Sequence, residues 1–436
     1  MKTLSRRDFH RTVAAGAAAS AIALQIKSAR AEVGPNDKIR LGAIGYGGRG
    51  TGNLAEFLKD PRIECVSVCD VDQAHLDKAV AHVEQQGGNR PDAVKDFRRV
   101  VERDDIDAIL VSTPDHWHAL PTIFACQTGK DVYVEKPLAR TIDEGRAIVE
   151  ATRKHKRVVQ MGTQWRSQPH YLDAVAYIHS GKLGAIRSVR GWSYKTWDIE
   201  ALPDGPAPEG VDYDLWLGPA PERAFNANRF HNNYRWYWDY GGGLMTDLGV
   251  HVINLCQWAT GLETPSRITS MGGVRVLNGI IETPDTQTAI YEFPTYTLTW
   301  EHQLQGTIGP HAGQSGACFS GANGSLVVHQ GGWEVIPDRA ADGAIEAEKH
   351  EAGADGRPAH VKNFLDCMAN RAQPVSNPDV GHHVSGLAHL GSIAMRAGCE
   401  ITWDPATERI TNSEVADALV GEPYRGPWVL PYSRRA

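Results

Sequence analysis

Short apolar runs alternate with longer amphipathic stretches between residues 38 and 160. Five of these runs are bounded by charged residues or glycine: 39–44, 63–69, 107–112, 131–134 and 158–161. Apolar runs of this length are typical of parallel strands that are buried on both faces. The stretch over 142–155 has helical periodicity. Because strands and helices alternate, the pattern predicts a doubly wound parallel sheet in this part of the chain.

The pattern changes after residue 161. Apolar and polar residues alternate with period two in three runs, 186–194, 286–293 and 296–303, which predicts half-buried strands. Helical stretches and an extended tail close the chain. About 400 residues exceed a single ordinary core. We therefore predict two domains of the α/β class, one over 38–160 and one over 161–436.

A glycine-rich turn follows the first predicted strand. Gly45, Gly47 and Gly50 form the pattern G-x-G-x-x-G, and a helical stretch comes next. The glycines permit a tight turn and let the backbone approach a pyrophosphate, while the N-terminus of the helix favours its negative charge. We expect the whole turn to bind a dinucleotide, through Gly45, Tyr46, Gly47, Gly48, Arg49 and Gly50.

An acidic residue ends the second predicted strand. Asp70 lies twenty residues after Gly50, where a carboxylate can accept hydrogen bonds from the adenosine ribose hydroxyls. It would repel a 2′-phosphate, and neither Val71 nor Asp72 offers a cation to bind one. The pattern therefore predicts a Rossmann domain that binds NAD in preference to NADP. A glycine turn in an unrelated α/β domain is the competing interpretation.

Polar residues follow two further strands of the predicted sheet. The third strand ends in Thr-Pro-Asp-His-Trp-His, and the fourth ends in Glu-Lys-Pro. Ligands of open α/β sheets bind at the carboxyl ends of the strands. We therefore expect the cofactor site to include Thr113, Pro114, His116, His118, Glu135 and Lys136. Two simpler interpretations stay open: the histidines cap the next helix, and Lys136 forms a structural salt bridge.

Candidate substrate-binding residues lie in the second domain. Three of them follow the last parallel strand directly, and an irregular, aromatic-rich stretch covers 203–240. Aromatic faces beside hydrogen-bonding groups suit a sugar ring, although a loop packed over a sheet or an oligomer contact has the same composition. The predicted substrate-binding residues are Gln164, Trp165, Arg166, His170, Tyr194, Arg235 and Trp236.

The N-terminus has the features of an export signal. A twin arginine at residues 6 and 7 precedes an Ala-rich segment, and Ala29-Arg30-Ala31 offers a cleavage site. We expect residues 1–31 to direct twin-arginine export to the periplasm or the extracellular space. An amphipathic helix or a membrane anchor ranks second, since Gly16, Ser20 and Gln25 interrupt a segment that is short for a membrane span.

The charge of the chain limits its partners. The formal net charge is −7, and residues 1–31 contain six basic side chains and one acid, so the cleaved chain is more acidic. This balance argues against nucleic acid or an anionic membrane as a partner. The seven cysteines show neither a C-x-x-C pair nor a metal-binding spacing. An Asp-x-x-x-His pair at residues 247 and 251 lacks a third ligand nearby, so no metal is assigned.

Four motifs together resemble one known family. They are the glycine turn, the Thr-Pro-Asp-His-Trp-His segment, Glu-Lys-Pro and the later Gly-Gly-Gly-Leu-Met-Thr-Asp-Leu-Gly-Val-His. The chain is similar over nearly its whole length after residue 31 to the glucose–fructose oxidoreductase / inositol dehydrogenase (Gfo/Idh/MocA) family. The resemblance implies a C-terminal α/β domain with a large open, mostly antiparallel sheet. It also implies hydride transfer between a nicotinamide cofactor and a sugar or cyclitol.

The same resemblance assigns catalytic roles. His251 takes the proton of the substrate hydroxyl, Asp247 orients the substrate or the imidazole, and Lys136 stabilises negative charge on the substrate oxygen. From the residues alone, Asp247 and His251 are simply a pair on one helical face. A free face of the large sheet suggests a homodimer or homotetramer.

Two other functions compete with net oxidoreduction. Some family members cleave glycosides by transient oxidation, elimination and re-reduction, which regenerates NAD in place and suits an exported enzyme. The related NAD-dependent α-N-acetylgalactosaminidases share the signal and the Rossmann domain, but their pattern lacks the Asp247/His251 helix. A binding protein that kept the fold without chemistry is the second alternative.

Overall fold

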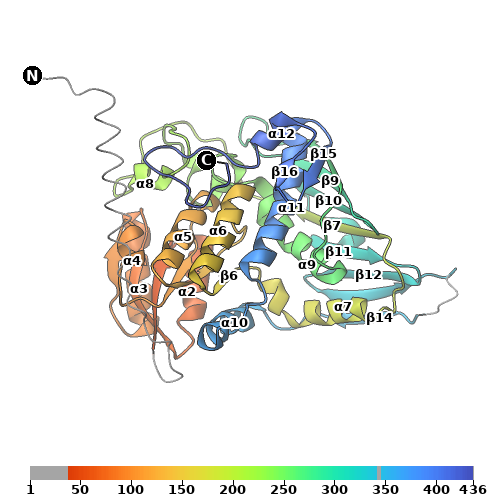
Figure 1. Cartoon of the computed structure of the whole chain (residues 1–436), viewed down its shortest axis with the longest axis horizontal. Coiled ribbons are helices and arrows are strands. Elements are labelled where there is room, and N and C mark those ends of the chain that lie inside the picture. Colours follow the sequence, from red (N-terminus) through yellow and green to blue (C-terminus); the bar gives the residue numbers. More distant parts are fainter. Residues whose placement is uncertain (1–37, 341–344, 436) are drawn as a thin grey trace, which may run out of the picture.

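The computed structural model describes residues 38–340 and 345–435. The predicted export signal lies outside these residues. Two sheets form the two halves of the molecule, one on each side of a layer that includes α9 (Val250–Thr260) and α11 (Pro378–Ala397) (Figure 1). Within the described part of the chain, no helix combines the length and hydropathy of a membrane span.

The N-terminal half is built on a six-stranded parallel sheet in the order β3-β2-β1-β4-β5-β6. Its strands are β1 (Ile39–Ile44), β2 (Ile63–Cys69), β3 (Asp92–Val94), β4 (Ala108–Val111), β5 (Asp131–Val134) and β6 (Val159–Met161). The strand order reverses between β1 and β4, as in doubly wound folds. The predicted parallel sheet is confirmed, and β3 is an addition that its short, exposed sequence did not reveal.

Helices cover both faces of this sheet. They are α2 (Gly48–Phe57), α3 (Gln73–Gly87), α4 (Arg98–Val101), η1 (Asp115–Trp117), α5 (Ala119–Gln127) and α6 (Ile142–His155). The helix predicted over 142–155 is confirmed. Its start is fixed by a capping box in which Thr141 and Glu144 bond reciprocally to each other's backbone. Asp72 caps α3 by accepting from the backbone of Ala74.

The C-terminal half contains a ten-stranded sheet in the order β14-β13-β12-β11-β7-β10-β9-β8-β15-β16. Its strands are β7 (Ser188–Lys195), β8 (Arg267–Gly273), β9 (Thr286–Glu292), β10 (Thr297–Leu304), β11 (Ser315–Ser320), β12 (Gly324–His329), β13 (Gly332–Pro337), β14 (Glu348–Glu351), β15 (Ile401–Asp404) and β16 (Arg409–Ile410). Among the strand pairs of the described residues in this sheet, β7–β10 alone is parallel. The expected large, mostly antiparallel sheet is therefore confirmed.

The remaining helical segments follow β6 in the chain. They are η2 (Gln164–Ser167), α7 (Pro169–His179), α8 (Tyr213–Leu217), η3 (Ala227–Arg229), η4 (His231–Trp236), η5 (Met245–Gly249), α9, η6 (Pro310–Ala312), α10 (Arg357–Asn370), α11 and α12 (Glu414–Ala418). The helix α11 packs against both α6 and β8. Phe364 of α10 packs its ring against Phe57 and Tyr133, inside the core of the N-terminal half.

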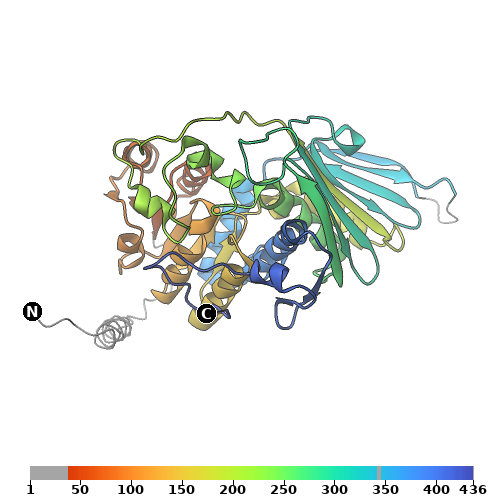
Figure 2. The ribbon, with the colours of Figure 1, turned by 90° about the horizontal axis from the view of Figure 1, so that it is seen from above.

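Residues 196–244, which we call the strap, leave the large sheet after β7 and run across to the N-terminal half (Figure 2). Asp212 donates its backbone N–H to the carbonyl of Val71, 2.9 Å away. Further along the strap, the carbonyl of Trp216 accepts a 2.9 Å hydrogen bond from the indole of Trp117. The aromatic-rich stretch is thus a connection that the N-terminal half holds in place through hydrogen bonds.

The C-terminal tail lies against its own chain. Tyr424 donates to the carboxylate of Glu144, and Trp428 meets the ring of Trp117 edge-on at 4.9 Å between centroids. The tail therefore packs on the N-terminal half rather than extending freely.

Candidate active site

A cleft of about 740 Å³ opens between the N-terminal half and the strap. One wall is formed by the ends of parallel strands and their loops, as expected for an open α/β sheet. The other wall is formed by strap residues and by η5 and its continuation α9. Twelve predicted site residues line the cleft: Gly45, Gly47, Gly48, Arg49, Asp70, Thr113, Pro114, Glu135, Lys136, Arg235, Asp247 and His251.

The glycine turn has the shape that a dinucleotide site requires. Gly45 has a φ of +87°, which side chains rarely adopt. A Cβ at Gly50 would lie 2.2 Å from the carbonyl oxygen of Gly45, so the turn closes only with glycine there. Gly48 opens α2, and no atom lies within 4 Å of where its Cβ would be. Backbone N–H groups at this helix start are therefore accessible to a phosphate group.

Asp70 lies at the carboxyl end of β2, beside this turn. Its carboxylate accepts a backbone hydrogen bond from Tyr46 at 2.8 Å and another from Asp72 at 3.0 Å. These bonds fix the carboxylate in the lining of the cleft, where it can accept further bonds from ribose hydroxyls. The turn, the helix start and Asp70 together fit NAD.

We expect Asp70→Asn to weaken NAD binding by about tenfold or more, because an amide offers one acceptor in place of a charged carboxylate. Selectivity against NADP should fall with it. Titration of both nucleotides by intrinsic fluorescence measures the two affinities. Asp77→Asn, on the exposed side of α3, is the control, and an unchanged NAD/NADP ratio in Asp70→Asn would contradict this role.

Lys136, Asp247 and His251 meet on the other side of the cleft. The ammonium of Lys136 donates to Asp247 twice, to Oδ1 at 2.5 Å and to the backbone oxygen at 2.9 Å. The guanidinium Nε of Arg235 lies 3.5 Å from the same Oδ1. Asp247 belongs to the π-helical turn η5, and His251 follows in α9. Such π-turns inside helices are frequent at functional sites.

The charges around this trio set its protonation. Burial lowers the pKa of His251, and the positive charges of Lys136 and Arg49 lower it further, well below the ordinary imidazole value. Burial disfavours ionisation of Asp247, but the charges of Lys136 and Arg235 overcome it and lower the pKa of Asp247. Near pH 7 the site therefore holds a neutral imidazole beside an ion pair.

Trp165 supports His251 from behind. Its indole stacks on the imidazole with 5.2 Å between centroids and on Tyr171 with 4.8 Å. Trp165 was predicted to bind substrate, but it is outside the lining of the cleft. The stacked rings restrict the orientation of the imidazole plane. Trp165 therefore contacts His251 and does not face the cleft.

Nine other predicted site residues also lie outside the cleft lining: Tyr46, Gly50, His116, His118, Gln164, Arg166, His170, Tyr194 and Trp236. Most of these side chains form hydrogen bonds or ring contacts away from the cleft. His116 bonds to the carbonyl of Trp216, and burial lowers its pKa to about 3. His118 bridges the carbonyls of Pro137 and Thr113. Both histidines therefore connect separate segments of the chain, and His118, at the N-cap of α5, makes no side-chain capping bond.

The predicted substrate residues outside the lining have structural partners too. The Nε of Arg166 donates to Asn254 at 2.6 Å, and burial lowers the pKa of Arg166 to about 10. His170 bonds to the carbonyl of His329, and Tyr194 donates to Glu301 on the large sheet. Trp236 is fully buried and meets Trp197 edge-on. These residues were chosen because they lie near other site residues in the sequence, which gives no information about their structural partners.

Several cleft residues were not predicted individually. Lys195 and Trp197 follow β7, and the Lys195 ammonium lies 4.5 Å from the centroid of the Trp197 ring. Tyr234 lines the cleft and donates to the buried carboxylate of Asp115 at 2.7 Å. Tyr234 belongs to the aromatic-rich stretch 203–240, whose composition did not single it out. No sequence signal distinguished Lys195, and Asp115 was noted only as part of the Thr-Pro-Asp-His-Trp-His segment.

Comparison with known proteins identifies the class. Residues 39–163 match the family profile described as "Oxidoreductase family, NAD-binding Rossmann fold". Residues 182–430 match "Oxidoreductase family, C-terminal alpha/beta domain". The second match covers more than half of the chain, so the protein is an oxidoreductase-fold protein of the Gfo/Idh/MocA family, with an NAD-binding domain. The family expected from the sequence is confirmed.

Curated relatives match over part of their length. A glycosyl hydrolase family 109 protein of Shewanella sp. is 38% identical over 130 residues, which is 29% of this chain and 28% of that protein. The alpha-N-acetylgalactosaminidase of Shewanella oneidensis is 34% identical over 158 residues, 34% of each chain. The matched segment thus spans about a third or less of these relatives.

Solved structures share the fold. Levoglucosan dehydrogenase in complex with NADH and levoglucosan has a TM-score of 0.66 at 17% identity, over 84% of this chain and 99% of that one. Aldose-aldose oxidoreductase from Caulobacter crescentus, complexed with glycerol, has a TM-score of 0.62 at 20% identity over the same shares.

Proposed function

We propose that this protein oxidises a hydroxyl carbon of a sugar, cyclitol or glycoside with tightly bound NAD. The observation that carries the proposal is the convergence of Lys136, Asp247 and His251 in one cleft with the glycine turn and Asp70. The cleft supplies a nucleotide site and an acid–base group side by side. The naming of relatives as glycoside hydrolases and sugar dehydrogenases supports a carbohydrate substrate.

Lys136, Asp247 and His251 have different roles in removing the proton of the substrate hydroxyl. Neutral His251 accepts the proton of the substrate hydroxyl. Lys136 has three N–H donors, of which two bond to Asp247, so one remains for the substrate oxygen. Asp247 holds the ammonium in place. When NAD is bound by the glycine turn and Asp70, it supplies the hydride acceptor.

A second candidate is glycoside cleavage through transient oxidation, and the curated relatives favour it. The matched segment of about 130 to 158 residues is similar to proteins named glycosyl hydrolase family 109 and alpha-N-acetylgalactosaminidase. In this reaction a ketone at the oxidised carbon acidifies the neighbouring C–H, the glycosidic substituent leaves, water adds, and the ketone is reduced again. The nucleotide is therefore oxidised NAD both before and after the reaction.

One experiment separates the two reactions. The NAD-loaded protein is incubated in D₂O with a panel of aryl glycosides and with the free sugars. Release of the aryl group, deuterium at the carbon beside the oxidised one, and no lasting NADH absorbance support cleavage. NADH formation up to one equivalent without aryl release supports net oxidoreduction that needs a second substrate. Absence of release, exchange and NADH in the whole panel would contradict both proposals.

We also propose export by the twin-arginine route and assembly with a second copy of the chain. The motif at residues 6 and 7 supports the first. The large sheet supports the second, because the strand β9 alternates buried and exposed residues and Ile290 on its outer side is 41% exposed. Fractionation of producing cells and light scattering of the purified protein measure the two properties. A cytoplasmic, monomeric product would refute both.

A further inference from the structure

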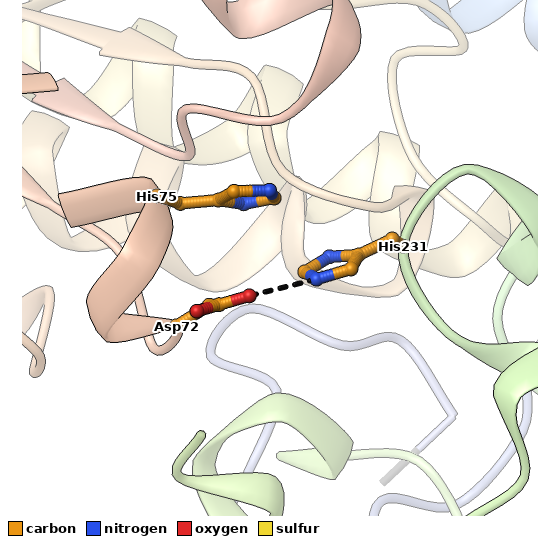
Figure 3. Close-up of side chains that lie close together, drawn as sticks. All are labelled: Asp72, His75 and His231. Atoms are coloured by element: carbon orange, nitrogen blue, oxygen red, sulfur yellow. Dashed lines mark hydrogen bonds and ion pairs between the residues drawn. The ribbon is translucent and has the colours of Figure 1, made fainter. Parts of the chain in front are cut away.

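Two histidines and an aspartate converge where the strap meets the N-terminal half (Figure 3). Asp72 caps α3, His75 lies in its first turn, and His231 comes from η4 in the strap. Each side chain offers a ligand atom, and these atoms all lie within 4.8 Å of one another. The Nε2 of His231 is 2.8 Å from Asp72 Oδ2, and the two imidazoles lie 4.3 Å apart between centroids.

We propose that Asp72, His75 and His231 bind a divalent transition-metal ion, with zinc as the best fit. Two imidazole nitrogens and one carboxylate oxygen form a donor set typical of zinc, whereas calcium and magnesium prefer oxygen donors alone. Three protein ligands leave a fourth position for water.

The spacing of the donor atoms is compatible with this ion. Zinc bonds of 2.0–2.1 Å in a tetrahedron separate neighbouring ligand atoms by about 3.3 Å. The Asp72–His231 distance of 2.8 Å needs only a small expansion, in which the metal replaces the proton of Nε2. His75 completes the set by a shift of its side chain, whose ring now lies against that of His231.

The charge of the surroundings also suits a dication. Asp70 Oδ2 lies 3.5 Å from Nδ1 of His75, so a second carboxylate lies beside one ligand. Carboxylates in this position orient metal-binding imidazoles in many proteins. Two carboxylates and two neutral imidazoles balance the +2 charge of zinc.

The site has a structural consequence for the strap. Val211 pairs with Asp72 through an isolated β-bridge, and the carbonyl of Gly210 accepts hydrogen bonds from Gln73 and Lys95. These contacts hold the strap at residues 210 and 211. A metal ligated by His231 would add a bond twenty residues further along. It would close the strap over the cleft that His75 and His231 both line.

Metal binding is tested on the full chain, purified without a polyhistidine tag and stripped with a chelator. Zinc is titrated against a chromophoric chelator, with magnesium and calcium as comparison ions. We expect one zinc per chain and a melting temperature at least about 2 °C higher at a hundredfold excess over Kd. His75→Ala, His231→Ala and Asp72→Asn should each weaken zinc binding tenfold or more. His82→Ala, on the same helix α3, is the matched control and should bind like the wild type.

Two results would overturn the proposal. One is the lack of stoichiometric zinc binding by the wild type, which would leave a hydrogen bond between Asp72 and His231 as the whole interaction. The other is zinc binding of equal strength in all three variants, which would place the ion elsewhere. X-ray absorption of the zinc-loaded wild type gives an answer that does not depend on folding of the variants. Two imidazoles among nitrogen and oxygen donors support the site, and a sulfur donor contradicts it. Because neither readout uses turnover, the outcome is independent of the proposed reaction.

Discussion

Replacing His251 with asparagine is expected to lower turnover by about two to four orders of magnitude while NAD stays bound. General acid–base catalysis contributes about this factor, and His251 is the one imidazole that lines the cleft beside the Lys136–Asp247 pair among the described residues. Its low pKa keeps it neutral, and thus able to accept a proton, near pH 7. The glycine turn and Asp70 are untouched, so nucleotide binding should persist.

Two measurements together test this role. Turnover is followed with a substrate found active in the wild type, and bound nucleotide is quantified by mass after denaturation. His179→Asn, an exposed substitution on α7, controls for the loss of a histidine. Turnover of His251→Asn within tenfold of the wild type would remove His251 from the mechanism. Loss of NAD together with activity would make it a binding residue.

The pKa of His251 also fixes the direction of the pH dependence. The imidazole must be neutral to accept a proton, so kcat/KM falls as the pH drops through its pKa. Burial and the charge of Lys136 lower this pKa well below 6.5. The acidic limb of the pH profile should therefore lie well below pH 6.5.

Replacing Lys136 with methionine is expected to lower turnover by about 10²–10³ and to move the acidic limb to higher pH. The loss of rate follows from removing a donor to the substrate oxygen. The shift follows from removing a positive charge that lowers the pKa of His251. Asp247→Asn should move the same limb in the opposite direction, because the negative charge of Asp247 raises that pKa.

The opposite signs make this pair a sharp test. Profiles of kcat/KM are measured for both variants, and Lys195→Met serves as the control. Lys195 is a second lysine in the cleft, but no ion pair joins it to Asp247. We expect its acidic limb to stay in place. Shifts of equal sign in Lys136→Met and Asp247→Asn would refute the electrostatic account, and unchanged turnover in Lys136→Met would exclude a contact with substrate.

The N-terminal half was predictable because its signals are local. A buried parallel strand needs a continuous apolar run, and a dinucleotide turn needs glycine at Gly45 and Gly50 for steric reasons that hold in any protein. The helix over 142–155 has its own capping box. By contrast, β3 is a short, exposed edge strand beside β2, so its sequence carries no apolar signal.

The predictions of individual site residues also depended on whether the signal was local. Residues whose position follows from a strand end, such as Lys136 and Asp70, do line the cleft. Residues chosen for composition or for nearness in sequence, such as Arg166 and Trp236, are outside its lining. An arginine or a tryptophan is equally suited to a buried partner and to a ligand. The sequence alone does not determine which of these partners such a side chain contacts.

The candidate catalytic residues Lys136, Asp247 and His251 were assigned by the family resemblance. By itself, the sequence determined the parallel sheet and the nucleotide turn. These depend on steric and periodic requirements within a few adjacent residues. Tertiary structure alone decided that Lys136 pairs with Asp247, 111 residues away, that burial and charge keep His251 neutral, and that the strap brings His231 to Asp72. The physical reason is that each of these contacts joins segments distant in sequence, so its distance and dielectric environment exist only once both halves have packed together.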